Sequence, residues 1–261
     1  MEYVIVSLVA LFASGLTMFS GFGLGTLLLP AFALFLPLDL AVAATALVHG
    51  ANSLLKGALL WRLADRHVVL KFGLPAIGAA LVGAWLLGRL SSDLILVQYE
   101  WLGRAAVITP LKLVMAALML VFAVLELHPA LTRLEFDRRF LPLGGVLSGF
   151  FGGLSGHQGA LRSAFLAKSG LSAQAFVGTN AVIGLLVDLS RLAVYAALLT
   201  GGTFHAVGAR ERWLIVAGAL AAFVGVVLGK RLLKKVTMQL VSRITGALLL
   251  LVAVLLGSGL V

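Results

Sequence analysis

Eight apolar stretches follow one another along the chain, separated by short charged or turn-rich links. Most of them reach the ~20 residues that an α-helix needs to cross the hydrocarbon core of a bilayer. The stretches cover residues 4–37, 39–61, 68–88, 107–127, 140–168, 173–199, 213–229 and 239–260. The pattern shows no series of alternating apolar and polar residues that would indicate membrane strands. It therefore predicts an all-α membrane protein.

Composition agrees with this pattern. Hydrophobic residues make up 61% of the chain and charged residues only 11%, whereas soluble domains have about 25% charged residues. The net charge of +10 comes mostly from basic residues in short links, where the positive-inside rule places them. Because no basic face is interleaved with aromatic residues, we expect no nucleic-acid partner. The chain has no cysteine, which excludes thiolate metal sites, and we expect neither a metal nor a cofactor.

The first and fifth apolar stretches are longer than one membrane span, and glycine-rich runs interrupt both of them. The runs are SGFGLG at residues 20–25 and GGLSGHQG at residues 152–159. Such runs disfavour a continuous helix, so we expect each stretch to break there. Gly145, Gly149 and Gly153 also recur every four residues, which predicts a closely packed helix face before the second break.

The two breaks correspond to each other. Gly159 lies 134 residues after Gly25, and the same offset takes Thr45 onto Thr179. We interpret this correspondence as an internal duplication. It predicts a single transport domain over residues 1–261, with a first repeat at 1–127 and a second at 140–261.

The basic links orient the two halves. The link that contains Arg62 and the link at 230–235 should both be cytoplasmic, but eight simple crossings would put them on opposite sides. The conflict disappears if each broken stretch enters and leaves the bilayer on one side, as a re-entrant element or as paired short helices. Residues 128–139 then also lie inside, and residues 90–106 lie outside. The predicted fold is two inverted repeats, each with a broken element and three transmembrane helices, which is typical of secondary transporters.

The breaks also carry a family resemblance. The run SGFGLGTLLLP at residues 20–30 resembles the first-repeat signature of the TauE/SafE sulfite exporter family. The runs SGHQGALRSAFL at 155–166, FVGTN at 176–180 and DLSR at 188–191 are similar to a subgroup of the same family. The resemblance covers nearly the whole chain. It implies transport of sulfite, sulfonates, related sulfur anions or organic acids.

The broken helices provide the first candidate site. A half-helix that begins at the middle of the bilayer directs its unbonded N–H groups and the positive end of its dipole inward, which suits an anion. Glycine would let the backbone approach the substrate; the alternative is that the glycines only permit close helix crossing. The candidate substrate-binding residues of the breaks are Gly23, Gly25, Thr26, Gly156, Gln158 and Gly159.

Two cationic or titratable side chains lie in or next to the second break. His157 could donate to an oxyanion or carry a proton; the alternative is a neutral histidine that bonds a backbone carbonyl. Arg162 follows one turn later and could pair with a sulfonate or carboxylate. Its alternative is a side chain that reaches the cytoplasmic interface near Lys168.

Asp188 and Arg191 lie three residues apart near the middle of the sixth stretch, on one helical face. Ionisable groups inside a membrane are costly and are often functional. One interpretation makes Asp188 the proton acceptor and lets Arg191 bind the anion when Asp188 is protonated. The other is a structural ion pair that fixes helix packing.

Further polar residues lie within the second and sixth stretches. His49 and Asn52 share a helical face, and Asn180 follows Thr179. These three side chains are candidates for hydrogen bonds to the substrate or, alternatively, for contacts between helices. We expect Lys56 to extend to the cytoplasmic interface near Arg62 rather than to bind substrate.

Other functions compete with transport. Gly153-Leu154-Ser155-Gly156 matches the G-x-S-G motif of rhomboid proteases, which use a serine–histidine pair. We expect His157 to be poorly placed as the base, and we expect no enzyme. A passive anion channel is the other alternative. The favoured hypothesis is a proton-linked, alternating-access carrier of a small anion in the inner (cytoplasmic) membrane, a multi-pass protein in contact with lipid that could form a homodimer.

Overall fold

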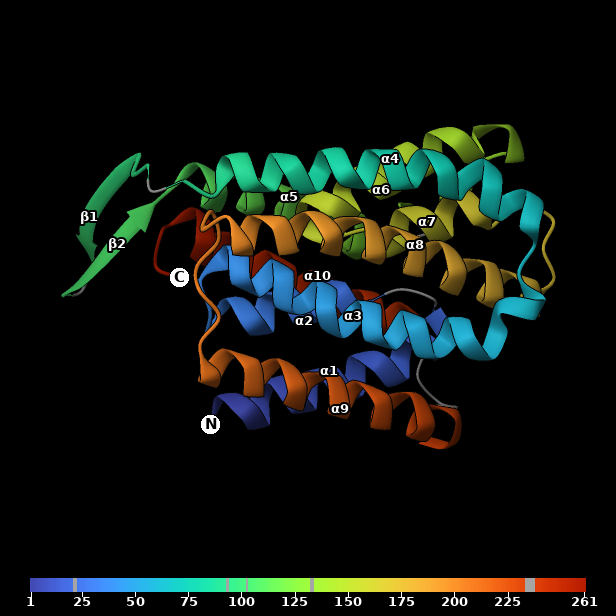
Figure 1. Ribbon diagram of the computed structural model, residues 1–261, viewed down its shortest axis with the longest axis horizontal. Helices are drawn as coiled ribbons and strands as arrows, with labels where there is room; N and C mark the ends of the chain where they lie inside the picture. Colours follow the sequence, from blue (N-terminus) through green and yellow to red (C-terminus); the bar gives the residue numbers. More distant parts are fainter. Residues whose placement is uncertain (21–22, 93, 102, 132–133, 233–237) are drawn as a thin grey trace.

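The computed structural model describes residues 1–261 except 21–22, 93, 102, 132–133 and 233–237. It is a bundle of α-helices with one small hairpin at its edge (Figure 1). The helices are α1 (Glu2–Ser20), α2 (Leu24–Ala33), α3 (Leu38–Leu60), α4 (Arg66–Leu90), α5 (Pro110–Leu127), α6 (Leu141–Ser155), α7 (Gly159–Leu166), α8 (Ala173–Thr200), α9 (Ala209–Leu232) and α10 (Met238–Gly257). The hairpin consists of β1 (Val97–Trp101) and β2 (Arg104–Ile108).

Six helices in the described residues are long and apolar enough to cross a membrane: α3, α4, α5, α8, α9 and α10. The all-α, multi-pass membrane architecture predicted from the sequence is thereby confirmed. The first and fifth apolar stretches each form two helices, α1 with α2 and α6 with α7, as the glycine runs predicted. Each half of the chain thus contains a broken helix followed by three long helices. The inverted relation between the halves and the re-entrant course of the broken helices stay predictions.

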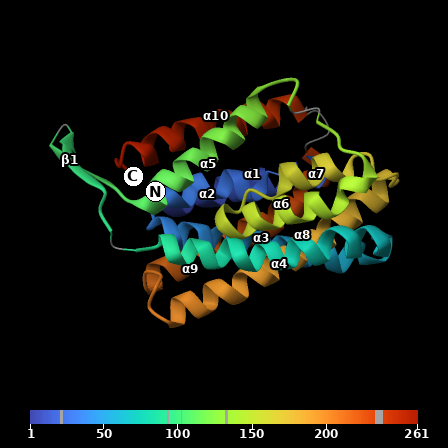
Figure 2. The same cartoon turned by 90° about the horizontal axis from the view of Figure 1, so that it is seen from above.

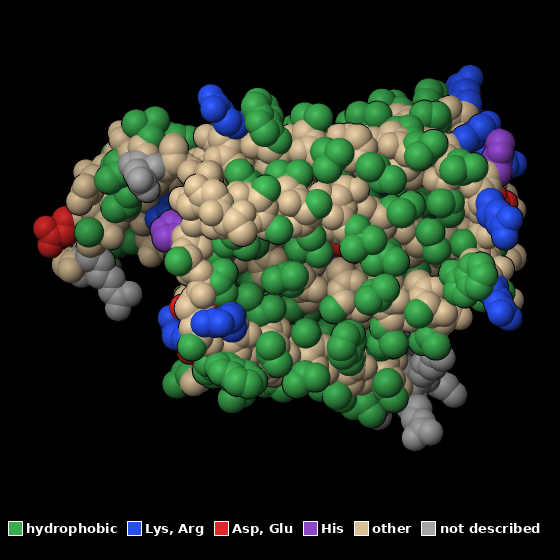
Figure 3. Space-filling view, in the orientation of Figure 1, with side chains coloured by type: hydrophobic (Ala, Val, Ile, Leu, Met, Phe, Trp, Pro, Cys, Tyr) green, Lys and Arg blue, Asp and Glu red, His purple; other side chains and the backbone are tan. Residues whose placement is uncertain are grey.

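The connecting segments sort to the two ends of the bundle. The links at 61–65, 128–137 and 167–172 lie at one end, while the hairpin and both termini lie at the other (Figures 1 and 2). The sides of the bundle are largely apolar, and Lys and Arg side chains gather at the ends (Figure 3). The exposed basic residues at the end that carries the 61–65 link include Arg62, Arg66, Arg139 and Lys168. The side chains of the basic link at 230–235 lie outside the described residues.

Small residues bring α4 and α6 into backbone contact, and this contact holds the second broken helix in place. A Cβ atom added to Gly145 would lie 2.2 Å from the carbonyl oxygen of Phe72, and one added to Gly149 would lie 2.2 Å from that of Ala76. The predicted close packing of this glycine face is therefore confirmed. Because each glycine faces a backbone atom rather than a flexible side chain, the α4 helix cannot yield locally to a larger residue.

The hairpin was not predicted. Residues 90–106 were expected to form a polar link, but β1 and β2 pair antiparallel, with Val97 opposite Ile108. Val97 to Trp101 alternates apolar and polar residues, which is the strand signal that the sequence contained. The hairpin is tied to the C-terminus, because Tyr99 donates to the carbonyl of Ser258 at 2.5 Å. The apolar stretch predicted from residue 107 is consequently shorter as a helix, since α5 begins only at Pro110.

The α4–α6 contact yields a stability prediction. Gly149→Ala should lower the free energy of unfolding by about 1–3 kcal/mol, because the added methyl group overpacks a backbone contact. Gly78→Ala is the matched control on α4, since a Cβ atom at Gly78 would meet nothing within 4 Å. Thermal unfolding of the purified protein in detergent measures both. Equal stability of the two variants would contradict the close packing.

Candidate functional site

The second break is a tight turn between α6 and α7. Gly156 ends α6 with a φ of +83°, a left-handed conformation that favours glycine. The side chain of Ser148 donates to the carbonyl of Gln158 at 3.0 Å, and the N–H of Arg162 donates to the same carbonyl at 3.0 Å as α7 begins. A Cβ atom on Gly156 would lie 3.1 Å from Nη1 of Arg191. Glycine is therefore required at this position both for its backbone conformation and for the approach of the arginine.

The first break lies against the second. A Cβ atom added to Gly25 would lie 3.2 Å from the carbonyl oxygen of Gly156 and 3.5 Å from the ring of His49. Gly23, with a φ of +114°, precedes α2, and Thr26 is buried in the first turn of that helix. The structure thus brings together the two glycine-rich segments that the sequence places 134 residues apart.

Asp188 lies where three elements meet near the breaks. Its Oδ1 accepts hydrogen bonds from Arg191 Nη2 at 2.7 Å, Gln158 Nε2 at 3.0 Å and Arg191 Nε at 3.1 Å. Its Oδ2 lies 2.6 Å from Nδ1 of His49. Arg191 also donates to the carbonyl of Gly152 at 3.1 Å, and both members of the ion pair are fully buried. The pair therefore links α3 and α8 to the second break, and a proton-accepting role for Asp188 stays a prediction.

Arg162 points into the protein from α7. Its Nε donates to Oδ1 of Asn180, and its Nη1 donates to Oε1 of Gln158 at 2.7 Å. Only 3% of the residue is exposed, so the alternative in which Arg162 reaches the membrane interface is wrong. The amide of Gln158 accepts from Arg162 and donates to Asp188. This amide therefore connects the arginine of α7 to the ion pair of α8.

A small cavity of about 30 Å³ lies beside Arg162. Its walls come from α3, α7 and α8, and no carboxylate is among the residues that line it: His49, Asn52, Ser53, Lys56, Arg162, Val177, Asn180 and Ala181. Such a volume holds a water molecule but not a larger anion, since one water needs about 10–15 Å³. The arrangement is thus a closed, cation-rich site.

Lys56 was wrongly placed by the sequence interpretation. The residue is only 9% exposed and lines the cavity together with Arg162, whereas we expected it to extend to the membrane interface. His49, Asn52, Ser53 and Lys56 are spaced by three or four residues, so they share one face of α3. That periodicity was the signal that could have placed Lys56 with the other polar residues. Asn52 is held in place by Ser14 of α1, whose hydroxyl donates to its side-chain oxygen at 2.9 Å.

His157 turns away from the Asp188 cluster. Its ring stacks on Phe122 of α5, with 4.8 Å between the ring centroids, and its Nδ1 lies 3.0 Å from Oγ of Ser155. Its Nε2 is buried and has no hydrogen-bond partner among the described residues. The structure therefore does not bring this predicted site residue to the cavity beside Arg162.

The short distance between Ser155 and His157 corrects one expectation. The histidine is within hydrogen-bond distance of the serine, although we expected it to be poorly placed. The hydroxyl of Ser155, however, donates to the carbonyl of Phe151 at 3.1 Å, so the histidine is the donor in this contact. The two residues are only 1% and 2% exposed. A nucleophile needs its proton directed to the base and access to substrate, and this pair has neither.

The buried ion pair yields a second stability prediction. Asp188→Asn should lower the free energy of unfolding by about 3–5 kcal/mol, because it leaves the Arg191 charge buried without its counterion. Combining it with Arg191→Gln should recover part of the loss. Thermal unfolding in detergent measures the series. Glu135→Gln is the control, since the Glu135–Lys168 pair is about half exposed and surface pairs contribute about 0–1 kcal/mol; an Asp188→Asn loss no larger than this would contradict the assignment.

Comparison with known proteins gives one match that covers nearly the entire chain. The family model described as sulfite exporter TauE/SafE matches residues 6–256 of the 261. No curated protein and no solved structure matches the chain. The match includes both broken helices and every helix that contributes to the cluster. The chain therefore belongs to the sulfite exporter TauE/SafE family of membrane transporters.

Proposed function

We propose that the protein is a secondary transporter that moves a small sulfur-containing anion, such as sulfite or a sulfonate, or a related carboxylate across the cytoplasmic membrane. The observation that carries the proposal is the buried cavity lined by Arg162 and Lys56, beside the point where two broken helices meet. Buried cations at membrane depth are costly unless a counterion joins them. Family membership supports a sulfur-containing anion as that counterion.

Arg162 is the primary substrate contact in this proposal. Asn180 and Gln158 fix its guanidinium group through Nε and Nη1, so the planar fork is already oriented in the closed state. A preorganised guanidinium binds a sulfonate or carboxylate with little loss of side-chain entropy. The broken helices α2 and α7 add the positive ends of their dipoles near the same point.

Proton coupling follows from the shared amide of Gln158. This side chain donates to Asp188 and accepts from Arg162, so protonation of Asp188 would weaken its bonds to Gln158 and Arg191. Anion binding at Arg162 and proton binding at Asp188 are then linked through one side chain, which is a coupling free energy between two sites. In this proposal Asp188 is the proton site and His49 is its hydrogen-bond partner.

The helix contacts support inverted halves. The offset of 134 residues relates α1 to α6, α3 to α8, α4 to α9 and α5 to α10. In the structure α1 packs on α9 and α6 packs on α4, while α3 packs on α8 and α5 on α10. Each contact thus maps onto another contact, or onto itself, when the halves are exchanged. A two-fold relation of this kind is the basis of alternating access in inverted-repeat transporters.

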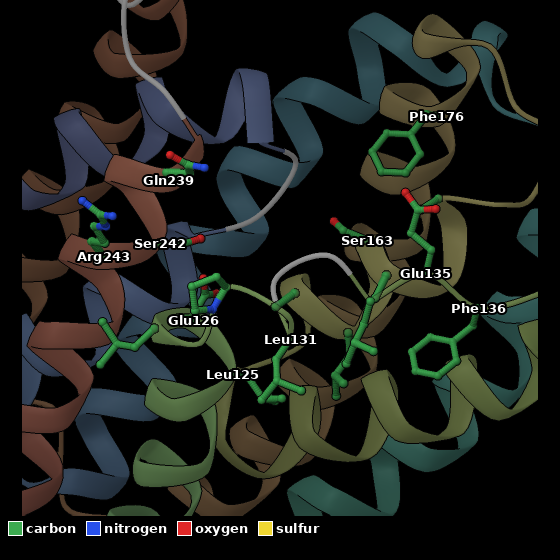
Figure 4. Close-up of a pocket in the computed structure, with 17 residues that line it drawn as sticks. Leu125, Glu126, Leu131, Glu135, Phe136, Ser163, Phe176, Gln239, Ser242 and Arg243 are labelled. Carbon is green, nitrogen blue, oxygen red and sulfur yellow. The ribbon is translucent and has the colours of Figure 1, made fainter.

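The substrate path requires α7 to move. Ala160, Leu161, Ser163 and Ala164 on α7 line a cavity of about 530 Å³ between α5, α8 and α10 (Figure 4). Arg162 on the same short helix instead lines the closed cavity of about 30 Å³. The helix therefore separates a large cavity near the basic end of the bundle from the proposed site. We place this end in the cytoplasm by the positive-inside rule, so a shift of α7 would open the site inward.

Transport by purified protein in proteoliposomes tests the proposal. Wild type should take up labelled sulfite with saturation, and Arg162→Gln should lower the uptake rate at low substrate by about 10–100-fold, because hydrogen bonds to charged groups contribute about 1.5–3 kcal/mol. Ser155→Ala should keep most of the activity, since Ser155 bonds only Phe151 and His157. Full transport by Arg162→Gln would contradict the site. Flux that does not saturate would favour an anion channel.

A further inference from the structure

Lys56 and Arg162 are two cations on different helices that line the same small cavity. Lys56 lies on α3 and Arg162 on α7, and Asn180 of α8 completes the wall between them. The other polar side chains that line the cavity are His49, Asn52 and Ser53. All of these polar groups can donate hydrogen bonds, and none of them is a carboxylate. The cavity is thus built to surround negative charge from two sides.

The charges around the cavity do not cancel. Asp188 is paired with Arg191 at 2.7 Å and contacts His49 at 2.6 Å, so its single negative charge is balanced by the arginine of its own helix. Arg162 contacts the amide groups of Gln158 and Asn180, which are neutral. Lys56 adds a second positive charge at the same cavity. Two like charges repel strongly in a low-dielectric interior, and a ligand that carries two negative charges would relieve that repulsion.

We propose that Lys56 is the specificity-determining residue that selects anions with two negative charges over anions with one. The inference rests on the proposed transport function and adds to it the charge of the substrate. One anionic group binds Arg162, and the second, either on the same oxyanion or at the far end of a short organic anion, binds Lys56. A monovalent anion satisfies Arg162 and leaves the charge of Lys56 uncompensated. The position of Lys56 on a helix other than α7 provides contacts to both sides of the ligand.

Paired probes isolate the second charge. β-Sulfopropionate carries a sulfonate and a carboxylate, while β-sulfopropionamide has nearly the same shape and only the sulfonate charge. Wild type should bind the divalent probe at least tenfold more tightly, as measured by thermal stabilisation of purified protein at graded ligand concentration. Lys56→Gln should bind the divalent probe about tenfold more weakly than wild type and leave the affinity for the amide unchanged. Lys56→Arg should retain the preference, because it keeps the charge.

Two further variants and one further ligand separate the possible failures. Lys71→Gln removes an exposed lysine from α4 and should match wild type with both probes. Arg162→Gln should weaken the binding of both probes alike. If wild type binds sulfite and both probes, but Lys56→Gln keeps the full preference for the divalent probe, the role of Lys56 is overturned and the transport proposal stands. If wild type binds neither sulfite nor either probe, both the role of Lys56 and the proposed site are overturned.

Discussion

A carboxylate held away from water must be surrounded by hydrogen-bond donors, and the cluster around Asp188 meets this constraint with side chains from three parts of the chain. Arg191 comes from its own helix, His49 from α3 and Gln158 from the second break. Each of these donors has a fixed position only because α3, α6 and α8 are held together. The cost of burying the charge therefore links the geometry of the break to the packing of the long helices, and through Gln158 it also sets the position of Arg162.

Close approach of small residues makes this arrangement possible. Glycine faces on α6 let the broken helix lie directly on the backbone of α4, and Gly225 of α9 approaches the backbone of α1 in a comparable way, with a hypothetical Cβ atom 2.2 Å from the carbonyl oxygen of Leu11. In both cases a broken helix of one half packs on a long helix of the other half. Rigid contacts of this kind can hold the outer frame while the short helix α7, which has one cavity on either side, remains the element best able to shift.

Hydropathy and glycine content were sufficient to predict the helical membrane architecture and the two breaks, because membrane depth and backbone conformation impose strong requirements on residue type. They could not decide between alternatives that depend on side-chain direction. Arg162 and Lys56 could each reach either the interface or the interior, and both turn inward. His157 lies within the break, yet it stacks on Phe122 of a helix from the other half. The hairpin was missed because its alternation over β1 is short and lies in a link that reads as polar.

The central claim is that the anion binds at Arg162, between α3, α7 and α8. A structure of the purified protein determined with sulfite tests it most directly, because it shows where the anion lies without depending on the rate of any transport step. The account predicts density for the anion in contact with the guanidinium of Arg162, in an enlarged form of the cavity that Asn180 and Lys56 line. Sulfite bound elsewhere, for instance only in the large cavity between α5 and α10, with Arg162 still enclosed, would contradict it.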